Sequence, residues 1–155
     1  MTKQEFNKTL KELNLTKKEF CEKLRINYTS LVSSWFRVVP IPQYAISWLE
    51  IYKTAQKYEQ FAEIFKKEFI FKNTIQEEST KFTRKEFDIR LQELKLTRLE
   101  FCKKVGMNEN SILSNWDRQS PIPLWVESWL NTYENAKNFK ILYNCIHSNF
   151  KTKEN

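Results

Sequence analysis

The feature that most constrains this chain is an internal repeat: residues 2–69 align with residues 83–150 without a gap. Phe6 pairs with Phe87, and the same offset of 81 residues brings tryptophans, cysteines and both Pro-Ile-Pro motifs into step. The best-matched stretches run from Leu15 to Trp35 and from Leu96 to Trp116. A gapless match of this length is not expected by chance, so the sequence indicates a duplicated unit.

The composition favours an all-α fold. The 155 residues include one glycine and four prolines, and no alternating β-branched run is present. We predict a tandem repeat of two helix-turn-helix bundles, each ending in a long helix. The first repeat spans residues 1–71, the polar segment 72–81 is the linker, and the second repeat spans residues 82–155.

Helix starts are indicated by four capping boxes, in which a threonine precedes a glutamate by three residues. The four threonines are Thr2, Thr16, Thr83 and Thr97. In the first repeat they predict helices at about 2–13 and 16–24, followed by a third helix at 28–36. Its counterpart in the second repeat is expected at 109–117. Asn27 and Asn108 are suited to cap these third helices, and Gly106 is suited to a turn with positive φ.

The fourth helix of each repeat begins near Pro42 or Pro123 and meets no helix breaker for about 28 residues. Its apolar stripe continues from Ala55 to Phe69, beyond what a bundle of this size covers. We expect this tail to pack against its copy in the other repeat. The alternative is a homodimer, in which two chains join through the same long fourth helices.

Charge is unevenly distributed. The net charge is +7; residues 1–39 carry eight basic and four acidic side chains, and residues 82–120 carry eight and six. This excess is consistent with a polyanionic partner, and equally with a solvated lysine-rich surface.

Several classes of protein are disfavoured. No apolar run reaches the roughly 18 residues that a membrane span needs, and no signal segment follows Met1, so we expect a cytoplasmic protein without a membrane partner. Three cysteines and the single histidine, His147, form no metal-ligand pattern, and we expect no metal and no cofactor. An enzyme is disfavoured because no glycine-rich phosphate loop or paired carboxylates are evident.

Residues 2–52 and 83–133 resemble the helix-turn-helix family of the phage λ-repressor type. The family pattern asks for a small residue midway along the second helix, which Cys21 and Cys102 provide, and these thiols are interpreted as small core groups. It asks for glycine at the turn, where Gly106 complies and Arg25 does not. The resemblance implies a transcriptional regulator whose third helix enters the major groove of double-stranded DNA.

Short polar side chains crowd the third helices, although serine, threonine and asparagine are poor helix formers for a merely solvated face. Asparagine can pair with adenine, glutamate can accept from cytosine, and threonine or tyrosine can touch a thymine methyl group. The predicted base-reading residues are Asn27, Tyr28, Thr29, Ser30, Ser33, Asn108, Glu109, Asn110, Ser111, Ser114 and Asn115. The predicted phosphate contacts are Lys17, Lys18, Lys23, Arg25, Arg37, Arg98, Lys103, Lys104 and Arg118.

The two third helices differ at most exposed positions, so we expect two different half-sites read by one chain. An alternative function is a protein–protein interaction adaptor, which Glu109 and Asp117 favour for the second repeat because they would face phosphates. RNA binding ranks lower, because the aromatic residues are expected to be internal. If only one copy reads DNA strongly, we expect the stretch from Leu15 to Trp35.

Overall fold

The computed structural model describes residues 1–68, 82–110, 112, 116 and 121–151, with side chains for all of these except 65–68 and 149–151. The helices are α1 (Lys3–Glu12), α2 (Lys17–Leu24), α3 (Tyr28–Ser33), α4 (Gln43–Glu68), α5 (Arg84–Glu93), α6 (Arg98–Val105) and α8 (Leu124–Lys151). The described part of the chain is all-α, as predicted. The predicted linker at 72–81 lies outside the described residues. The bounds of α1 and α2 recur in α5 and α6 at the offset of 81.

The four shorter helices with capping boxes begin where the sequence predicts. The Thr2 amide donates to the Glu5 carboxylate at 2.7 Å, and the Glu5 amide donates to Thr2 Oγ1 at 3.2 Å. The same reciprocal pair of bonds begins α2, α5 and α6. Each box satisfies two amides that have no partner within the helix. This prediction is confirmed.

The capping boxes make the stability of the fold depend on pH. The pKa values of Glu5, Glu19 and Glu100 lie below the ordinary 4.5. The main cause is the hydrogen bond from the backbone amide of the capping threonine, and the second is the hydrogen bond with its hydroxyl group. A carboxylate with a lowered folded-state pKa stabilises the fold above 4.5, and this stabilisation is lost as pH falls through the folded-state pKa. We expect the melting temperature to fall below pH 4.5. A variant with all three glutamates changed to glutamine should show a shallower fall, and an unchanged profile would contradict this origin.

The turn after α2 has the same backbone conformation in both halves. Gly106 has φ +68° and Arg25 has φ +57°, so both residues are left-handed. A residue with a side chain loses about 1–2 kcal/mol of conformational free energy in this region, and this penalty applies to Arg25 but not to Gly106. A Cβ atom at position 106 would lie 2.5 Å from Gln43 Cβ, so space there is closed to any larger residue.

Helix α3 is shorter than the predicted span of 28–36, and that prediction is wrong at its end. The helix stops at Ser33 because the Val38 and Val39 amides both donate to the Ser34 carbonyl, which folds the chain back. Phe36 lies in this turn with φ +63°, and its amide donates to the Val39 carbonyl at 2.8 Å. The chain thus leaves the helix two residues before Trp35 enters the core.

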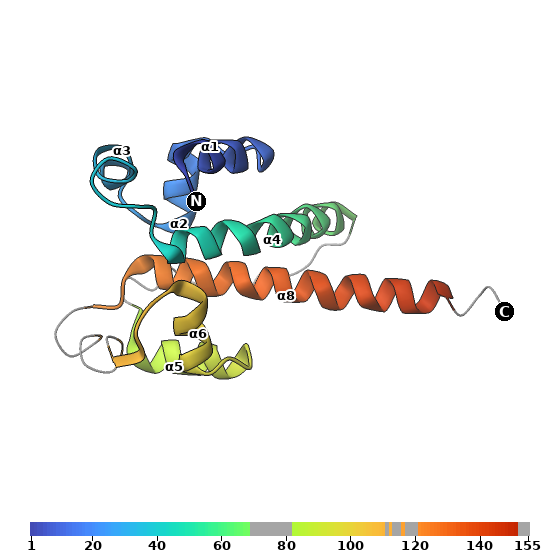
Figure 1. The fold of residues 1–155 in the computed structure, drawn as a ribbon. Helices are drawn as coiled ribbons and strands as arrows, with labels where there is room; N and C mark the ends of the chain where they lie inside the picture. Colours follow the sequence, from blue (N-terminus) through green and yellow to red (C-terminus); the bar gives the residue numbers. More distant parts are fainter. Residues whose placement is uncertain (69–81, 111, 113–115, 117–120, 152–155) are drawn as a thin grey trace.

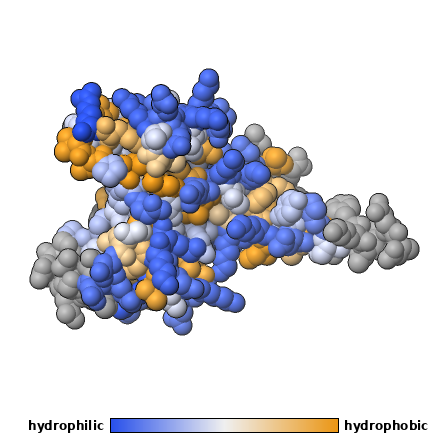
Figure 2. Space-filling model, in the orientation of Figure 1, coloured by the Kyte–Doolittle hydropathy of each residue, from blue (hydrophilic) through white to orange (hydrophobic). Residues whose placement is uncertain are grey.

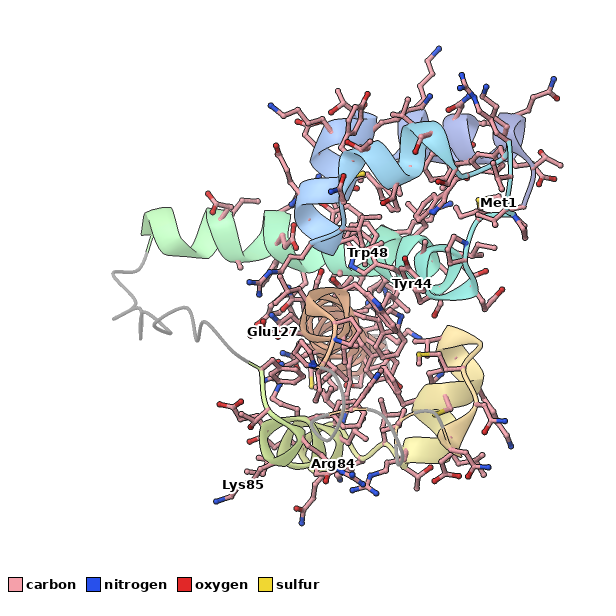
Figure 3. The ribbon with its side chains drawn as sticks, turned by 90° about the vertical axis from the view of Figure 1, so that its left-hand side faces the viewer. Met1, Tyr44, Trp48, Arg84, Lys85 and Glu127 are labelled. Atoms are coloured by element: carbon pink, nitrogen blue, oxygen red, sulfur yellow. The ribbon has the colours of Figure 1, made fainter. Side chains whose placement is uncertain are left out.

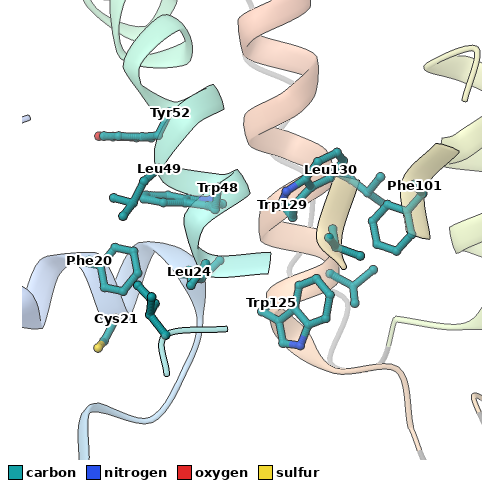
Figure 4. Close-up of a cluster of buried hydrophobic side chains, with 14 of the residues drawn as sticks. Phe20, Cys21, Leu24, Trp48, Leu49, Tyr52, Phe101, Trp125, Trp129 and Leu130 are labelled. Atoms are coloured by element: carbon teal, nitrogen blue, oxygen red, sulfur yellow. The ribbon is translucent and has the colours of Figure 1, made fainter. Parts of the chain in front are cut away.

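The core of each half is built from matching aromatic contacts (Figure 4). Phe20 meets Trp48 edge-on with ring centroids 5.5 Å apart, and Phe101 meets Trp129 edge-on at 5.3 Å. Cys21 and Cys102 are each 2% exposed, which confirms that they are small core residues. Burial raises the pKa of the Cys21 thiol to about 11, so that thiol stays protonated at neutral pH.

The long helices α4 and α8 run side by side in the same direction through the middle of the molecule (Figure 1). Near their starts, Tyr44 stacks on its own counterpart Trp125 at 4.2 Å. Ala55 and Ala136 are also buried, so the predicted packing of the fourth helices on each other is confirmed to this depth. Farther along, α8 continues with exposed apolar side chains that include Ile141, and the homodimer stays an untested alternative.

The halves also pack crosswise, with α2 against α8 and α6 against α4. Helices α1 to α3 lie on one side of the α4 and α8 pair, and α5 and α6 lie on the other side (Figure 3). Arg25 donates to Glu127 of α8 at 2.5 Å, and the Ser128 hydroxyl donates to the Lys23 carbonyl. On the opposite side Gly106 lies against Gln43. The turn of each half is therefore covered by the long helix of the other.

One pair of tryptophans breaks this symmetry. Trp129 Nε1 donates to Ser47 Oγ at 3.2 Å, whereas Trp48 Nε1 is buried without an acceptor among the described residues. We expect Trp129→Phe to cost about 1 kcal/mol more than Trp48→Phe, because both lose similar area but only Trp129 loses a hydrogen bond. Urea unfolding of the two variants measures the difference, and equal losses would contradict the bond.

A candidate nucleic-acid interface on the first half

Three basic side chains of the first half surround one hollow of about 180 Å³. Lys3 and Lys17 are the first residues of α1 and α2, directly after their threonine caps, and Arg37 follows α3. The capping boxes thus fix where these two lysines start. The other residues that line the hollow are Phe6, Asn7, Tyr28, Leu31, Val32, Trp35 and Phe36. None of the residues that line it is acidic.

Helix α3 forms one wall of this hollow and presents exposed polar side chains. Tyr28, Thr29, Ser30 and Ser33 are exposed, as the sequence predicts for base-reading residues. Two hydrogen bonds limit what some of them can offer. Asn27 Oδ1 accepts from the Thr29 amide at 2.7 Å, and the Ser33 hydroxyl donates to the Thr29 carbonyl at 2.7 Å. The cap bond takes one of the two lone pairs of Asn27 Oδ1 and fixes the side chain against the backbone, which restricts pairing with adenine through both amide atoms.

The matching position in the second half is neutralised. Arg98 is the counterpart of Lys17, and it donates two bonds to Asp88, at 2.8 Å and 2.6 Å. Asp88 is in turn the counterpart of Asn7. The hydrogen bonding of the Arg98 guanidinium to the Asp88 carboxylate raises the pKa of Arg98, and the charges of Asp88 and Glu109 raise it further. The predicted phosphate contact Arg98 therefore already has an anionic partner, unlike the basic hollow of the first half.

Three other predicted phosphate contacts lie elsewhere and take part in packing. Lys23 Nζ lies 3.9 Å from a Glu59 carboxylate oxygen and over the Tyr52 ring, and Lys104 Nζ lies over the Tyr133 ring. Arg25 is held by Glu127. The sequence grouped Lys23 and Arg25 with Lys17, and Lys104 with Arg98, but the later residues of α2 and α6 face the long helices. Lys18 and Lys103 are exposed, and Lys18 lies 3.8 Å from Glu22.

Little of the second predicted third helix is described. Asn108 Oδ1 accepts from the Asn110 amide at 2.9 Å, so Asn108 is a cap like Asn27. Glu109 is half-buried and Asn110 is exposed. The remaining predicted site residues of this segment lie outside the described residues: Ser111, Ser114, Asn115 and Arg118, together with Asp117.

Sequence reasoning missed three residues of the hollow: Lys3, Asn7 and Val32. The repeat itself held a signal for two of them: the offset pairs Lys3 with Arg84, which keeps the positive charge, and Asn7 with Asp88, which introduces a negative one. Val32 gave no such signal, since an apolar residue in a short helix is ordinarily assigned to the core.

Other kinds of site are not evident in the described part of the chain. No group of three or more histidine, cysteine, aspartate or glutamate side chains there could hold a metal ion. No described helix is both long enough and apolar enough to cross a membrane. In comparisons with known proteins, no family model, no curated protein and no solved structure matched this chain. We therefore infer function from the residues and geometry of the site alone.

Proposed function

We propose that this chain binds double-stranded DNA in a sequence-specific manner, as a transcriptional regulator. Its halves are two tandem helix-turn-helix units of the phage λ-repressor type, and α3 is the helix that enters the major groove. The basic hollow beside the exposed face of α3 is the main support for this function. Lys3, Lys17 and Arg37 flank that face without a carboxylate in the lining.

This arrangement suits a duplex because the two kinds of contact are separated. Cations at the edges of a reading helix bind phosphates and fix the position of the protein, while the exposed side chains of the helix reach base edges. Lys3 and Lys17 come from the starts of two different helices, and Arg37 comes from the other end of α3. The three charges are therefore spread around the reading face rather than gathered at one point.

The two halves contribute unequally in this proposal. Helices α4 and α8 begin side by side, at the same end of the molecule (Figure 1). In this proposal the two half-sites lie about 34 Å apart on one face of DNA. The Asp88–Arg98 pair weakens the phosphate contact of the second half, so the first half supplies most of the affinity.

Selection from a random duplex library with the whole chain tests this function. We expect a split, non-palindromic site. The logarithm of the affinity should fall linearly with the logarithm of salt concentration, with a slope of about −3 if three cations each neutralise one phosphate. Negligible affinity for every duplex at low salt would refute the proposal.

A protein-interaction adaptor is the second candidate, and features of the second half favour it. Asp88 and Glu109 make its matching surface more acidic, and α8 exposes Ile141 and Tyr143, which are 54% and 49% exposed. Replacing Glu109 by glutamine separates the two functions. A base-reading Glu109 should change the selected sequence, whereas a contact to a protein partner should leave DNA binding as it was.

A further inference from the structure

Helix α3 exposes apolar side chains as well as polar ones. Tyr28 and Val32 lie one turn apart and are 47% and 43% exposed, while Leu31, which lines the same hollow, is buried. Val38 and Val39, in the turn that follows α3, are 79% and 44% exposed. We call these four exposed side chains the α3 apolar patch. Figure 2 shows apolar surface at the end of the molecule where α3 lies, bordered by hydrophilic side chains.

Val32 is poorly suited to its position unless something covers it. A β-branched residue is an unfavourable choice for an exposed helix position, and the helix has only six residues. A single exposed valine is ordinary on a protein surface, but neighbouring exposed apolar side chains around a hollow indicate an interaction site. Val32 and Tyr28 both line the basic hollow, so these two side chains of the patch face the same partner as the cations.

The charges of the hollow decide which partner fits. Lys3, Lys17 and Arg37 line it together with Val32, and no acidic side chain does. The partner must therefore have an apolar group that contacts Val32 and negatively charged groups around it that contact the three cations. The major groove of DNA has that character only at thymine, whose C5-methyl group is the apolar group on the base edges, with phosphates on both sides.

We infer that Val32, with Tyr28 beside it, recognises thymine methyl groups, so that the half-site read by the first half contains thymine at the bases under α3. This inference rests on the proposed DNA binding and assigns one determinant of its specificity. The polar neighbour Thr29 lies on the same helix and is exposed, whereas the Ser33 hydroxyl already donates to the Thr29 carbonyl.

The test uses the full chain and the duplex selected from the random library. Each thymine of that duplex is replaced in turn by deoxyuridine, which lacks only the methyl group and keeps the same base pairing. We expect one or two positions at which the affinity of the native chain falls about three- to tenfold, as expected for one buried methyl group. Val32→Ala should bind the thymine duplex more weakly and should show no further fall at one of those positions.

The alanine variant should keep its fold, because alanine favours the helix more than valine does and the position is exposed. Ile89→Ala is the matched control, since Ile89 is a 45% exposed β-branched residue on α5. This control should retain the full response to deoxyuridine.

Three results would overturn the inference while leaving DNA binding intact. They are a specific site whose affinity no deoxyuridine changes, a half-site under α3 without thymine, and a deoxyuridine effect that is the same in Val32→Ala as in the native chain. Absence of binding to any duplex at low salt would instead remove the proposed function, and the inference with it.

Discussion

Replacing Gly106 by alanine is expected to destabilise the folded chain by about 2–4 kcal/mol. Alanine at φ +68° costs about 1–2 kcal/mol, and the added Cβ atom would meet Gln43 Cβ at 2.5 Å, so the start of α4 must shift as well. Urea unfolding followed by circular dichroism measures the loss.

Two further variants separate the contributions at Gly106. Gln43→Gly in the same chain removes the atom that the new methyl group meets, and should recover the steric part of the loss but not the backbone part. Arg25→Gly should change stability by less than about 1 kcal/mol, because the relief of left-handed backbone offsets the lost contact with Glu127. A Gly106→Ala chain as stable as the native one would contradict the close packing of this turn on α4.

Reversing the charge of Lys17 and Arg37 together is expected to lower duplex affinity about 100-fold at low salt. Each reversal replaces an attraction to phosphate by a repulsion of similar size, and tenfold in affinity corresponds to about 1.4 kcal/mol. The slope against salt should become shallower by about two. Glutamate at the first position of α2 is favoured by the helix dipole, so the loss should not come from unfolding. Titrations at several salt concentrations measure both changes.

The controls for this prediction come from the repeat. Lys53→Glu changes an exposed lysine on α4 and should lower affinity only slightly. Asp88→Asn should raise affinity several-fold, because it frees Arg98, and Asn7→Asp should lower it by placing the same acid in the first half. If Lys53→Glu weakens binding as much as the double reversal does, the basic hollow is not the phosphate site.

The parts of the fold that the sequence predicted correctly are those with short-range causes. The two residues of a capping box are three positions apart in the sequence. Thr16 and Glu19 therefore predict the start of α2 without any tertiary information. The positive φ of Gly106 likewise follows from the absence of a side chain. The 81-residue offset then carried each of these local assignments into the other half.

The candidate site was predicted less well, because its charges depend on distances across the fold. Lys23 and Lys17 share a helix and a charge, but one lies against Tyr52 and Glu59 while the other lines the hollow. Spacing along α2 does not say which side the long helices cover. The end of α3 was missed for a similar reason, since backbone bonds to the Ser34 carbonyl compete with helix continuation.

The crosswise packing of turns on long helices has a consequence for how the chain acquires its structure. The contacts of Arg25 with Glu127 and of Lys23 with Ser128 join residues about a hundred positions apart. During synthesis the first half therefore emerges with its turn and the α4 surface around Tyr44 uncovered until α8 has been made. Closing such long loops is slow compared with forming local helices. Docking of α8, the last helix of the second half, is then the step that closes the core.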